Sequence, residues 1–266
     1  MKGIYLIPDR ANIEESLALA KENLAGFEYN DFFLPVVLDD KEKQQEIINF
    51  YAKVRTDFSK DTMHGAFLDV TVHSTDRRIK EVSELRIRQS LDIAKEMGLR
   101  GSVFHTNRIY GFRDNTYLKN WEEANYRFFA TVCEEYPMQQ IFMENMFDEA
   151  PDVLLGLAER MKGYENFGIC LDYAHGAISD TSATGWVRLL APYIKHMHIN
   201  DNDFANDLHL PVGAGELNWE QFSKEVTGYG VDATVLVEVS GVEKQKLSLT
   251  YMKERGIYPL GGIRWD

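Results

Sequence analysis

Short apolar runs alternate with amphipathic stretches from one end of the chain to the other. The apolar runs are rich in β-branched and aromatic residues and have the length of buried strands. They cover Gly3–Ile7, Phe27–Leu34, Met63–Val70, Ser102–Thr106, Gln140–Asn145, Gly168–Leu171, Ile194–Ile199 and Thr234–Val239. The stretches between them carry apolar residues near helical spacing. They cover Asn12–Leu24, Lys41–Val54, Ile79–Met97, Trp121–Glu135, Asp152–Met161, Gly185–Tyr193, Trp219–Thr227 and Glu243–Glu254. The alternation predicts an α/β fold, a single (β/α)8 barrel around a parallel sheet.

An open, doubly wound sheet is the structural alternative, because it shows the same alternation. The usual nucleotide-binding motifs of such sheets do not occur in the sequence: no GxGxxG follows the first apolar run, and there is no P-loop pattern. The second run is the least clear strand, since Asp31 interrupts it. No linker, low-complexity segment or change of composition divides the chain, so residues 1–266 are expected to form one domain.

Composition narrows the class of protein. Apolar residues make up 44% of the sequence, enough for a large core, and the net charge is −13. DNA binding depends on phosphate neutralisation by Lys and Arg, so this charge disfavours nucleic acid and suits an enzyme that gathers divalent cations. The N-terminal apolar run is too short for a signal peptide or a membrane helix, and we expect a cytoplasmic protein without a membrane partner. Cys133 and Cys170 are expected to be small buried apolar residues.

Carboxylates end several of the apolar runs. Glu144, Asp172 and Glu238 each follow buried β-type sequence, and His198 lies at the end of another run. Barrel enzymes carry their chemistry at the C-terminal ends of the strands, and buried carboxylates are normally paired or bound to metal. These four residues therefore predict one metal site, whose ligand types suit Mn²⁺, Mg²⁺, Co²⁺ or Zn²⁺. Pairing of one or more carboxylates with Lys or Arg across the barrel is the alternative.

The other histidines divide into two sets. The first set is expected to face the same mouth of the barrel, as substrate-binding residues or ligands of additional metal, although each alone could be a buried core histidine. With the nearby carboxylate Asp207 it comprises His64, His105, His175, Asp207 and His209. In the second set, His196 shares strand parity with His198 and should point inward one layer deeper, in a supporting role. His73 lies in a charged loop and is expected to be solvated.

The Gly213-Ala-Gly215 segment has two interpretations. Its glycines can allow a tight turn or a close backbone approach before the helix at Trp219, which we favour. An anion-binding turn is the alternative.

Several of these segments resemble the xylose-isomerase-like TIM-barrel superfamily, which includes sugar and sugar-phosphate isomerases and epimerases as well as endonuclease IV. The resemblance covers nearly the whole length and is most specific in Phe167–His175, His198–Asp201, Asp207–His209 and Gly213–Gly215. It implies that the counterparts of the epimerase ligands, Glu144, Asp172, His198 and Glu238, bind one divalent metal. It also implies that the two glutamates exchange protons with the substrate on opposite faces of the sugar.

Endonuclease IV adds five further ligands and holds three zinc ions, and each ligand type has a counterpart here. The resemblance implies a first ion on His64, His105 and Glu144, and a third on His175, Asp207 and His209. The second would lie on the four residues named above, with Glu144 bridging. The nuclease signature has a lysine and an arginine where this chain has Asp203 and Leu208, and anionic DNA should disfavour both changes.

The sequence therefore predicts a divalent-metal-dependent isomerase or epimerase of a sugar or sugar derivative. Glu144 and Glu238 are the expected proton-transfer residues, acting through abstraction alpha to a carbonyl and an enediolate. The alternative is an abasic-site endonuclease with three zinc ions. Elimination on the same scaffold, a barrel used only for binding, and a homo-oligomer are left open. One metal ion is expected, with up to three allowed by the ligand set.

Overall fold

The computed structural model describes residues 3–261 of the protein. Its eight strands form a closed barrel in chain order, β1 to β8. This confirms the predicted (β/α)8 TIM barrel and shows that the open, doubly wound alternative is wrong. The described chain divides into two compact units. We call residues 3–27, 147–151 and 169–261 the terminal unit, and residues 28–146 and 152–168 the central unit. One domain over residues 1–266 stays a prediction, and residues 1–2 and 262–266 lie outside the described part.

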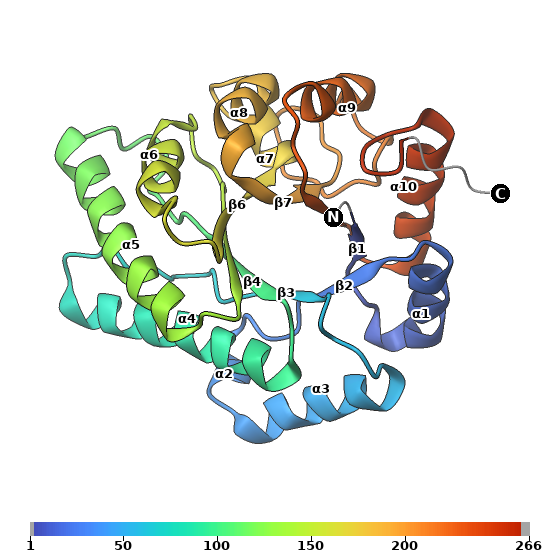
Figure 1. Ribbon diagram of the computed structural model, residues 1–266, viewed down its shortest axis with the longest axis horizontal. Coiled ribbons are helices and arrows are strands. Elements are labelled where there is room, and N and C mark those ends of the chain that lie inside the picture. The colour runs from blue at the N-terminus through green and yellow to red at the C-terminus, as the bar shows by residue number, and fades with distance from the viewer. Residues whose placement is uncertain (1–2, 262–266) are drawn as a thin grey trace. The chain divides into compact units, whose positions relative to one another are not determined.

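The terminal unit contains all or part of five strands, together with the first long helix and the C-terminal helices. Its elements are β1 (Ile4–Leu6), η1 (Arg10–Asn12), α1 (Ile13–Glu22), the start of β2 (Gly26–Tyr29), β6 (Phe167–Asp172) from Ile169, α7 (Tyr173–Ala177), α8 (Ala183–Leu190), η2 (Ala191–Tyr193), β7 (Ile194–Ile199), α9 (Trp219–Gly228), β8 (Thr234–Val237) and α10 (Val242–Arg255). Strand β1 pairs in parallel with both β2 and β8, and β7 pairs with β6 and β8. The first and last long helices, α1 and α10, lie side by side (Figure 1).

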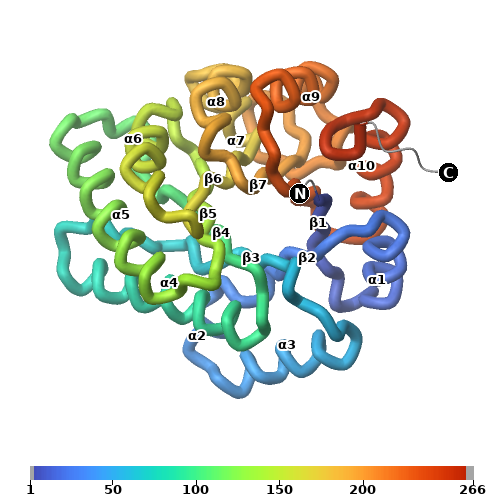
Figure 2. The backbone as a smooth tube through the Cα atoms, in the orientation of Figure 1, coloured from blue at the N-terminus to red at the C-terminus, as the bar shows by residue number. Residues whose placement is uncertain are grey.

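The central unit contains the end of β2 and the next three strands with their helices. Its elements are α2 (Pro35–Leu38), α3 (Lys41–Val54), β3 (Thr62–His64), α4 (Arg77–Met97), β4 (Gly101–His105), α5 (Asn115–Glu135), β5 (Gln140–Glu144) and α6 (Asp152–Met161). Strand β4 pairs in parallel with β3 and β5, and His105 lies directly opposite Glu144. Helices α5 and α6 pack against each other, as the tube in Figure 2 shows.

Two predicted strands are shorter than their apolar runs. The apolar run Phe27–Leu34 predicted a strand that reaches Leu34. The observed strand β2 ends at Tyr29, and the helical turn α2 begins at Pro35. Strand β3 covers Thr62–His64, not Met63–Val70. Val70 is nevertheless buried, because the loop after the strand also contributes to the core. Apolar residues in such a loop cannot be distinguished from strand residues by periodicity alone.

Helix boundaries differ where a polar cap decides them. Helix α5 begins at Asn115, six residues before the predicted start at Trp121, because the Asp114 side chain accepts a hydrogen bond from the backbone N–H of Tyr117. The short helix α7 was not predicted, and Asp172 caps it. Both cysteines are buried thiols, as expected. None of the helices within residues 3–261 combines the length and the apolar character needed to cross a bilayer.

Candidate metal centre

The terminal unit brings three of the four predicted principal ligands together. We call Asp172, His198 and Glu238 the Asp172 group. Asp172 ends β6 and pairs in register with His198 on β7, and Glu238 follows the last residue of β8. Each offers one ligand atom, and these atoms lie within 4.8 Å of one another. His198 Nδ1 is 3.4 Å from Glu238 Oε2.

Hydrogen bonds hold the Asp172 carboxylate and the backbone of Glu238 in place. One oxygen of Asp172 accepts a 2.6 Å hydrogen bond from the His175 N–H at the start of α7, and the other accepts from the Asn200 side chain at 3.4 Å. The Glu238 N–H donates to the Ile199 carbonyl, which keeps residue 238 beside β7. Asp172 is fully buried and Glu238 is 8% exposed. Two carboxylates and an imidazole in such a position fit a divalent cation, which offsets the cost of burying their charge.

The central unit brings together a second set of ligands at the ends of three successive strands. We call His64, His105 and Glu144 the His64 group. His64 Nε2 lies 3.0 Å from His105 Nε2, and His105 Nε2 lies 3.1 Å from Glu144 Oε2. His64 Nε2 is 3.7 Å from the same carboxylate oxygen. The three side chains therefore converge on one point, as metal ligands do.

The orientation of His64 is set by its neighbours. Its Nδ1 lies 2.9 Å from the Gly65 carbonyl, so Nδ1 carries the proton and Nε2 presents a lone pair to the group. The Phe67 ring packs against both imidazoles, with centroids 4.9 Å from His64 and 4.6 Å from His105. A side chain at residue 65 would collide with Phe104, since an added Cβ would lie 2.3 Å from that ring. Gly65 thus permits the close packing behind the group.

A third set, the Asp207 group, lies in the terminal unit and consists of His175, Asp207 and His209. Asp207 Oδ2 is 3.4 Å from His175 Nε2 and 3.3 Å from His209 Nε2. Burial by itself would raise the pKa of Asp207, but the hydrogen bonds from both imidazoles outweigh it and hold this pKa well below its usual range. Burial opposes the charge on His209, whereas the Asp207 hydrogen bond and the Glu238 charge raise its pKa to about 10. A metal ion would displace that proton.

The loop that carries Asp207 and His209 is organised by a carboxylate to which the sequence assigned no role. Asp201 Oδ1 accepts from the N–H groups of Asn202 (3.0 Å) and Leu217 (3.1 Å). Its Oδ2 accepts from the Gly213 N–H (2.9 Å) and from the Trp219 indole (2.8 Å). Two sequence signals mark this residue: Asp201 lies two residues after a strand, and it ends the His198–Asp201 segment of the family resemblance.

The glycines of the 213–215 segment serve close approach, as favoured from the sequence. An added Cβ on Gly215 would lie 2.4 Å from Asp201 Oδ1, and one on Gly213 would lie 2.4 Å from the Tyr251 ring. Gly213 also has a φ of +89°, a conformation that glycine adopts readily.

Within each unit, then, the predicted site residues converge. Glu144 lies with His64 and His105, and its sharing with the Asp172 group stays a prediction. His196 is buried, with Nδ1 2.6 Å from the Thr234 hydroxyl. The expectation that His73 is solvated is wrong, because that side chain is also buried.

A family model described as a xylose isomerase-like TIM barrel matches residues 17–255. The chain is 23% identical over 188 residues to the probable endonuclease 4 of Halorhodospira halophila, with 62% of each protein covered. It resembles the solved TTHB071 protein from Thermus thermophilus, soaked with ZnCl2, at a TM-score of 0.73 and 23% identity over 96% of this chain and 98% of that one. A D-tagatose 3-epimerase-like protein matches at a TM-score of 0.73 and 20% identity, with 96% and 97% covered. At these identities the structural likeness shows the shared fold alone.

Proposed function

This chain belongs to the xylose isomerase-like TIM-barrel family, and from that premise we propose that it is a divalent-metal-dependent isomerase or epimerase of a sugar or sugar derivative. One observation carries the proposal: the Asp172 group gathers two carboxylates and an imidazole at the ends of β6, β7 and β8, with their ligand atoms within 4.8 Å. Family members include enzymes with these activities, and the solved D-tagatose 3-epimerase-like protein shares the fold.

Glu144 completes the ligand set in this proposal. It ends β5, the strand that precedes β6 in the order of the barrel, and the C-terminal ends of barrel strands face the same side. The four residues would then supply three carboxylates and one imidazole, a set that suits Mn²⁺, Co²⁺, Mg²⁺ or Zn²⁺. A bound divalent ion polarises a carbonyl and its neighbouring hydroxyl and so acidifies the C–H between them.

The two glutamates move the proton. One carboxylate removes the proton from the carbon alpha to the carbonyl, and the substrate becomes an enediolate. The other returns a proton to the opposite face, which gives an epimer, or the same one returns it to the neighbouring carbon, which gives an isomer. For the epimer, one proton leaves the carbon and one returns to it, so atoms and charge balance. For the isomer, the hydroxyl proton also passes from the oxygen that becomes the carbonyl to the former carbonyl oxygen, and the balance again holds.

The His64 group favours a small polyol over a flat apolar ligand. His64 and His105 offer ring nitrogens, and Phe67 beside them is only part-buried. Small-molecule sites combine apolar walls with a few placed polar groups, and a sugar presents both C–H faces and hydroxyls. We propose that the ring nitrogens of His64 and His105 bind hydroxyl groups of the sugar substrate.

Exchange of substrate C–H for deuterium tests the proton transfer directly. Metal-loaded protein is incubated in D2O with a panel of ketoses and sugar phosphates, and deuterium at the carbon alpha to the carbonyl is followed by NMR. Glu144→Gln and Glu238→Gln should each lower the exchange rate by about 10²- to 10⁴-fold, because each removes a proton-transfer group. Matched controls are two buried glutamates elsewhere, Glu28→Gln in the central unit and Glu225→Gln in the terminal unit. Undiminished exchange in the first two variants would contradict the assignment.

Abasic-site endonuclease activity is the second candidate, and the Asp207 group favours it because a third ligand set suits a third zinc ion. The match to a probable endonuclease 4 also favours this candidate.

One observation argues against the nuclease. The exposed Asp203 carboxylate accepts hydrogen bonds within its own loop and would repel the phosphates of DNA. Zinc-loaded protein is therefore expected not to incise a duplex with one abasic site. Incision that a chelator abolishes would replace the sugar proposal with this one.

A further inference from the structure

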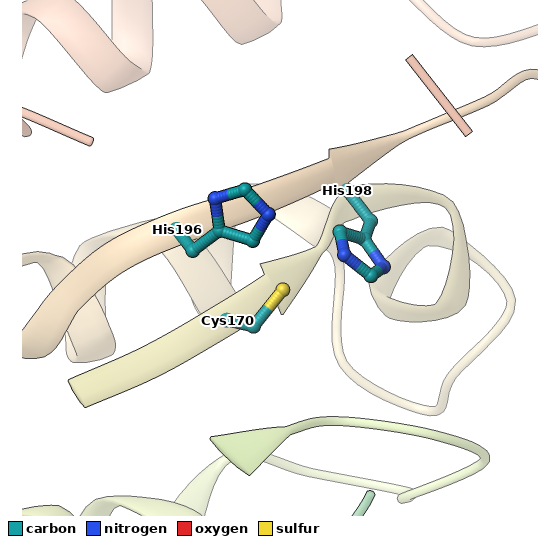
Figure 3. Close-up of side chains that lie close together, drawn as sticks. All are labelled: Cys170, His196 and His198. Atoms are coloured by element: carbon teal, nitrogen blue, oxygen red, sulfur yellow. The ribbon is translucent and has the colours of Figure 1, made fainter. Parts of the chain in front are cut away.

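A fourth group of potential ligands lies in the terminal unit, and the proposed reaction uses only one of its members. Cys170 on β6 and His196 and His198 on β7 each offer a ligand atom, and these atoms lie within 4.8 Å of one another. All three side chains are fully buried. In Figure 3 the Cys170 sulfur points from β6 toward the two imidazoles on β7.

Strand register brings these residues together. Cys170 pairs directly with His196, after a register shift between Ile169 and Cys170. His196 and His198 are two residues apart on one strand, so their side chains lie on the same face. Their ring centroids are 5.2 Å apart, with the planes nearly perpendicular.

The Thr234 hydroxyl orients His196 from the next strand. His196 pairs in register with Thr234 on β8, and the 2.6 Å contact joins its Nδ1 to the hydroxyl oxygen. A metal bound by His196 would therefore use Nε2. Hydrogen-bonding partners of this kind are typical of metal-bound histidines, because they fix the tautomer and the ring orientation.

We propose that Cys170, His196 and His198 form a second metal site, for a soft divalent metal of the Zn²⁺, Co²⁺ or Cd²⁺ class, which shares only His198 with the Asp172 group. A thiolate with two imidazoles selects such ions over Mg²⁺ and Mn²⁺, which prefer oxygen ligands. Binding forms the metal–sulfur bond and releases the thiol proton to solvent, so the charge of the buried ion is partly neutralised.

His198 couples this site to the proposed reaction. Its Nδ1 faces Glu238 in the Asp172 group. A neutral imidazole has a single lone pair to give to a metal, so it cannot serve an ion in each group at once. A soft metal on Cys170 therefore competes with Mn²⁺ at the Asp172 group. The site would act as an inhibitory site for thiophilic metals.

Cobalt absorption tests the site without any assay of activity. The chain has two cysteines, so the Cys133→Ser protein carries Cys170 as its single thiol. Titration of this metal-free protein with Co²⁺ should produce thiolate-to-cobalt charge-transfer absorption in the near ultraviolet. Absence of that absorption at saturating Co²⁺ would overturn the proposal, whether or not any Cys170 variant folds.

Two further variants test whether the charge-transfer absorption comes from Co²⁺ bound to Cys170 and His196. Cys170→Ser should lose it, and its persistence in that variant would also overturn the proposal. Thr234→Val should keep the band but weaken Co²⁺ affinity by about 10- to 100-fold, since it removes the partner that orients His196.

Competition between metals tests the coupling. Cd²⁺ added to the Mn²⁺-loaded protein should release Mn²⁺, measured by its electron paramagnetic resonance signal in solution, and the release should require Cys170. Equal release from the Cys170→Ser protein would show that Cd²⁺ acts at the carboxylates, and the coupling would be wrong. Failure of either experiment leaves Mn²⁺-dependent deuterium exchange untouched, so the two proposals fail separately.

Discussion

At the scale of one residue, His73 shows that a side chain can be buried although its neighbours in the sequence are charged. The charged residues after it indicate a solvated loop, but its ring packs against Tyr117 and Trp121. Its Nε2 is 3.2 Å from the Tyr117 hydroxyl, which itself accepts the Ile109 N–H at 2.9 Å. That hydroxyl can therefore donate its proton to a neutral ring. Burial, and then the Arg108 charge, lower the pKa of His73 to about 4.

This shift predicts that acid destabilises the fold through His73. An unfolded histidine has a pKa of about 6.5, so between that pH and about 4 the unfolded chain binds a proton that the folded chain does not. Stability should therefore fall as pH falls through this window, by at most about 1.4 kcal/mol per pH unit from this residue. Urea unfolding at pH 7.5 and 5.5 should show a smaller loss in His73→Gln than in the wild type. Equal losses would show that His73 does not titrate as described.

At the scale of elements, ligand geometry depends on how strand ends and loops are held. Asp172 ends β6 and also caps α7, so strand and helix both restrain it. Asp201 restrains the loop between β7 and α9 through four hydrogen bonds from residues as far along as Trp219. The Asp201 backbone also pairs with Leu210 in both directions. These contacts fix the loop that carries Asp207 and His209.

Replacing Asp201 should therefore loosen that loop. Asp201→Ala removes the acceptor of three backbone amides and one indole, and hydrogen bonds to a charged group contribute about 1.5–3 kcal/mol each. We expect the free energy of unfolding to drop by at least about 3 kcal/mol and the amide protons of Gly213 and Leu217 to exchange faster with solvent. Asp203→Asn, at an exposed position in the same loop, is the control and should change neither. Unchanged exchange at both amides in the Asp201 variant would refute this role.

At the scale of the whole molecule, the dominant feature is an acidic chain with several buried ligand groups. The net charge is −13, and each compact unit contains carboxylates that converge with imidazoles. Cations are attracted to such a protein and DNA is repelled from it. Metal binding and stability should accordingly be linked, because a ligand that binds only the folded state stabilises it.

Metal should raise the unfolding temperature. At a free Mn²⁺ or Co²⁺ concentration 100-fold above the dissociation constant, the stabilisation should be about 2.7 kcal/mol. Thermal unfolding with metal and with excess chelator measures the difference, and Glu238→Gln should reduce it. Identical melting with metal and with chelator would argue against a resident ion.

Elemental analysis of the purified protein separates the two candidate functions. About one Mn, Co or Mg per chain fits the sugar enzyme, and three zinc ions fit the nuclease.

The prediction from sequence succeeded where the physical cause is local. Strands buried on both faces appear as continuous apolar runs, as in β6, whose six residues are all buried. The helical spacing of apolar residues predicted the eight longest helices of residues 3–261. Side-chain caps such as Asp114 explain why some of them begin at other residues than predicted. Candidate ligands could be selected for the same reason, because a carboxylate that ends an apolar run is unusual wherever it occurs; their metal binding stays a prediction.

Tertiary structure alone decided which of these residues meet. The pairing of Cys170 with His196, the contact of Asp207 with two imidazoles and the burial of His73 join residues or elements that periodicity treats separately. Closure of the sheet, strand register and loop anchoring by Asp201 set these contacts, and each depends on the rest of the chain having folded. The sequence by itself thus determined the order of strands and helices and the chemistry at the strand ends. Packing between distant segments determined the distances, because a local pattern carries no information about its partner in space.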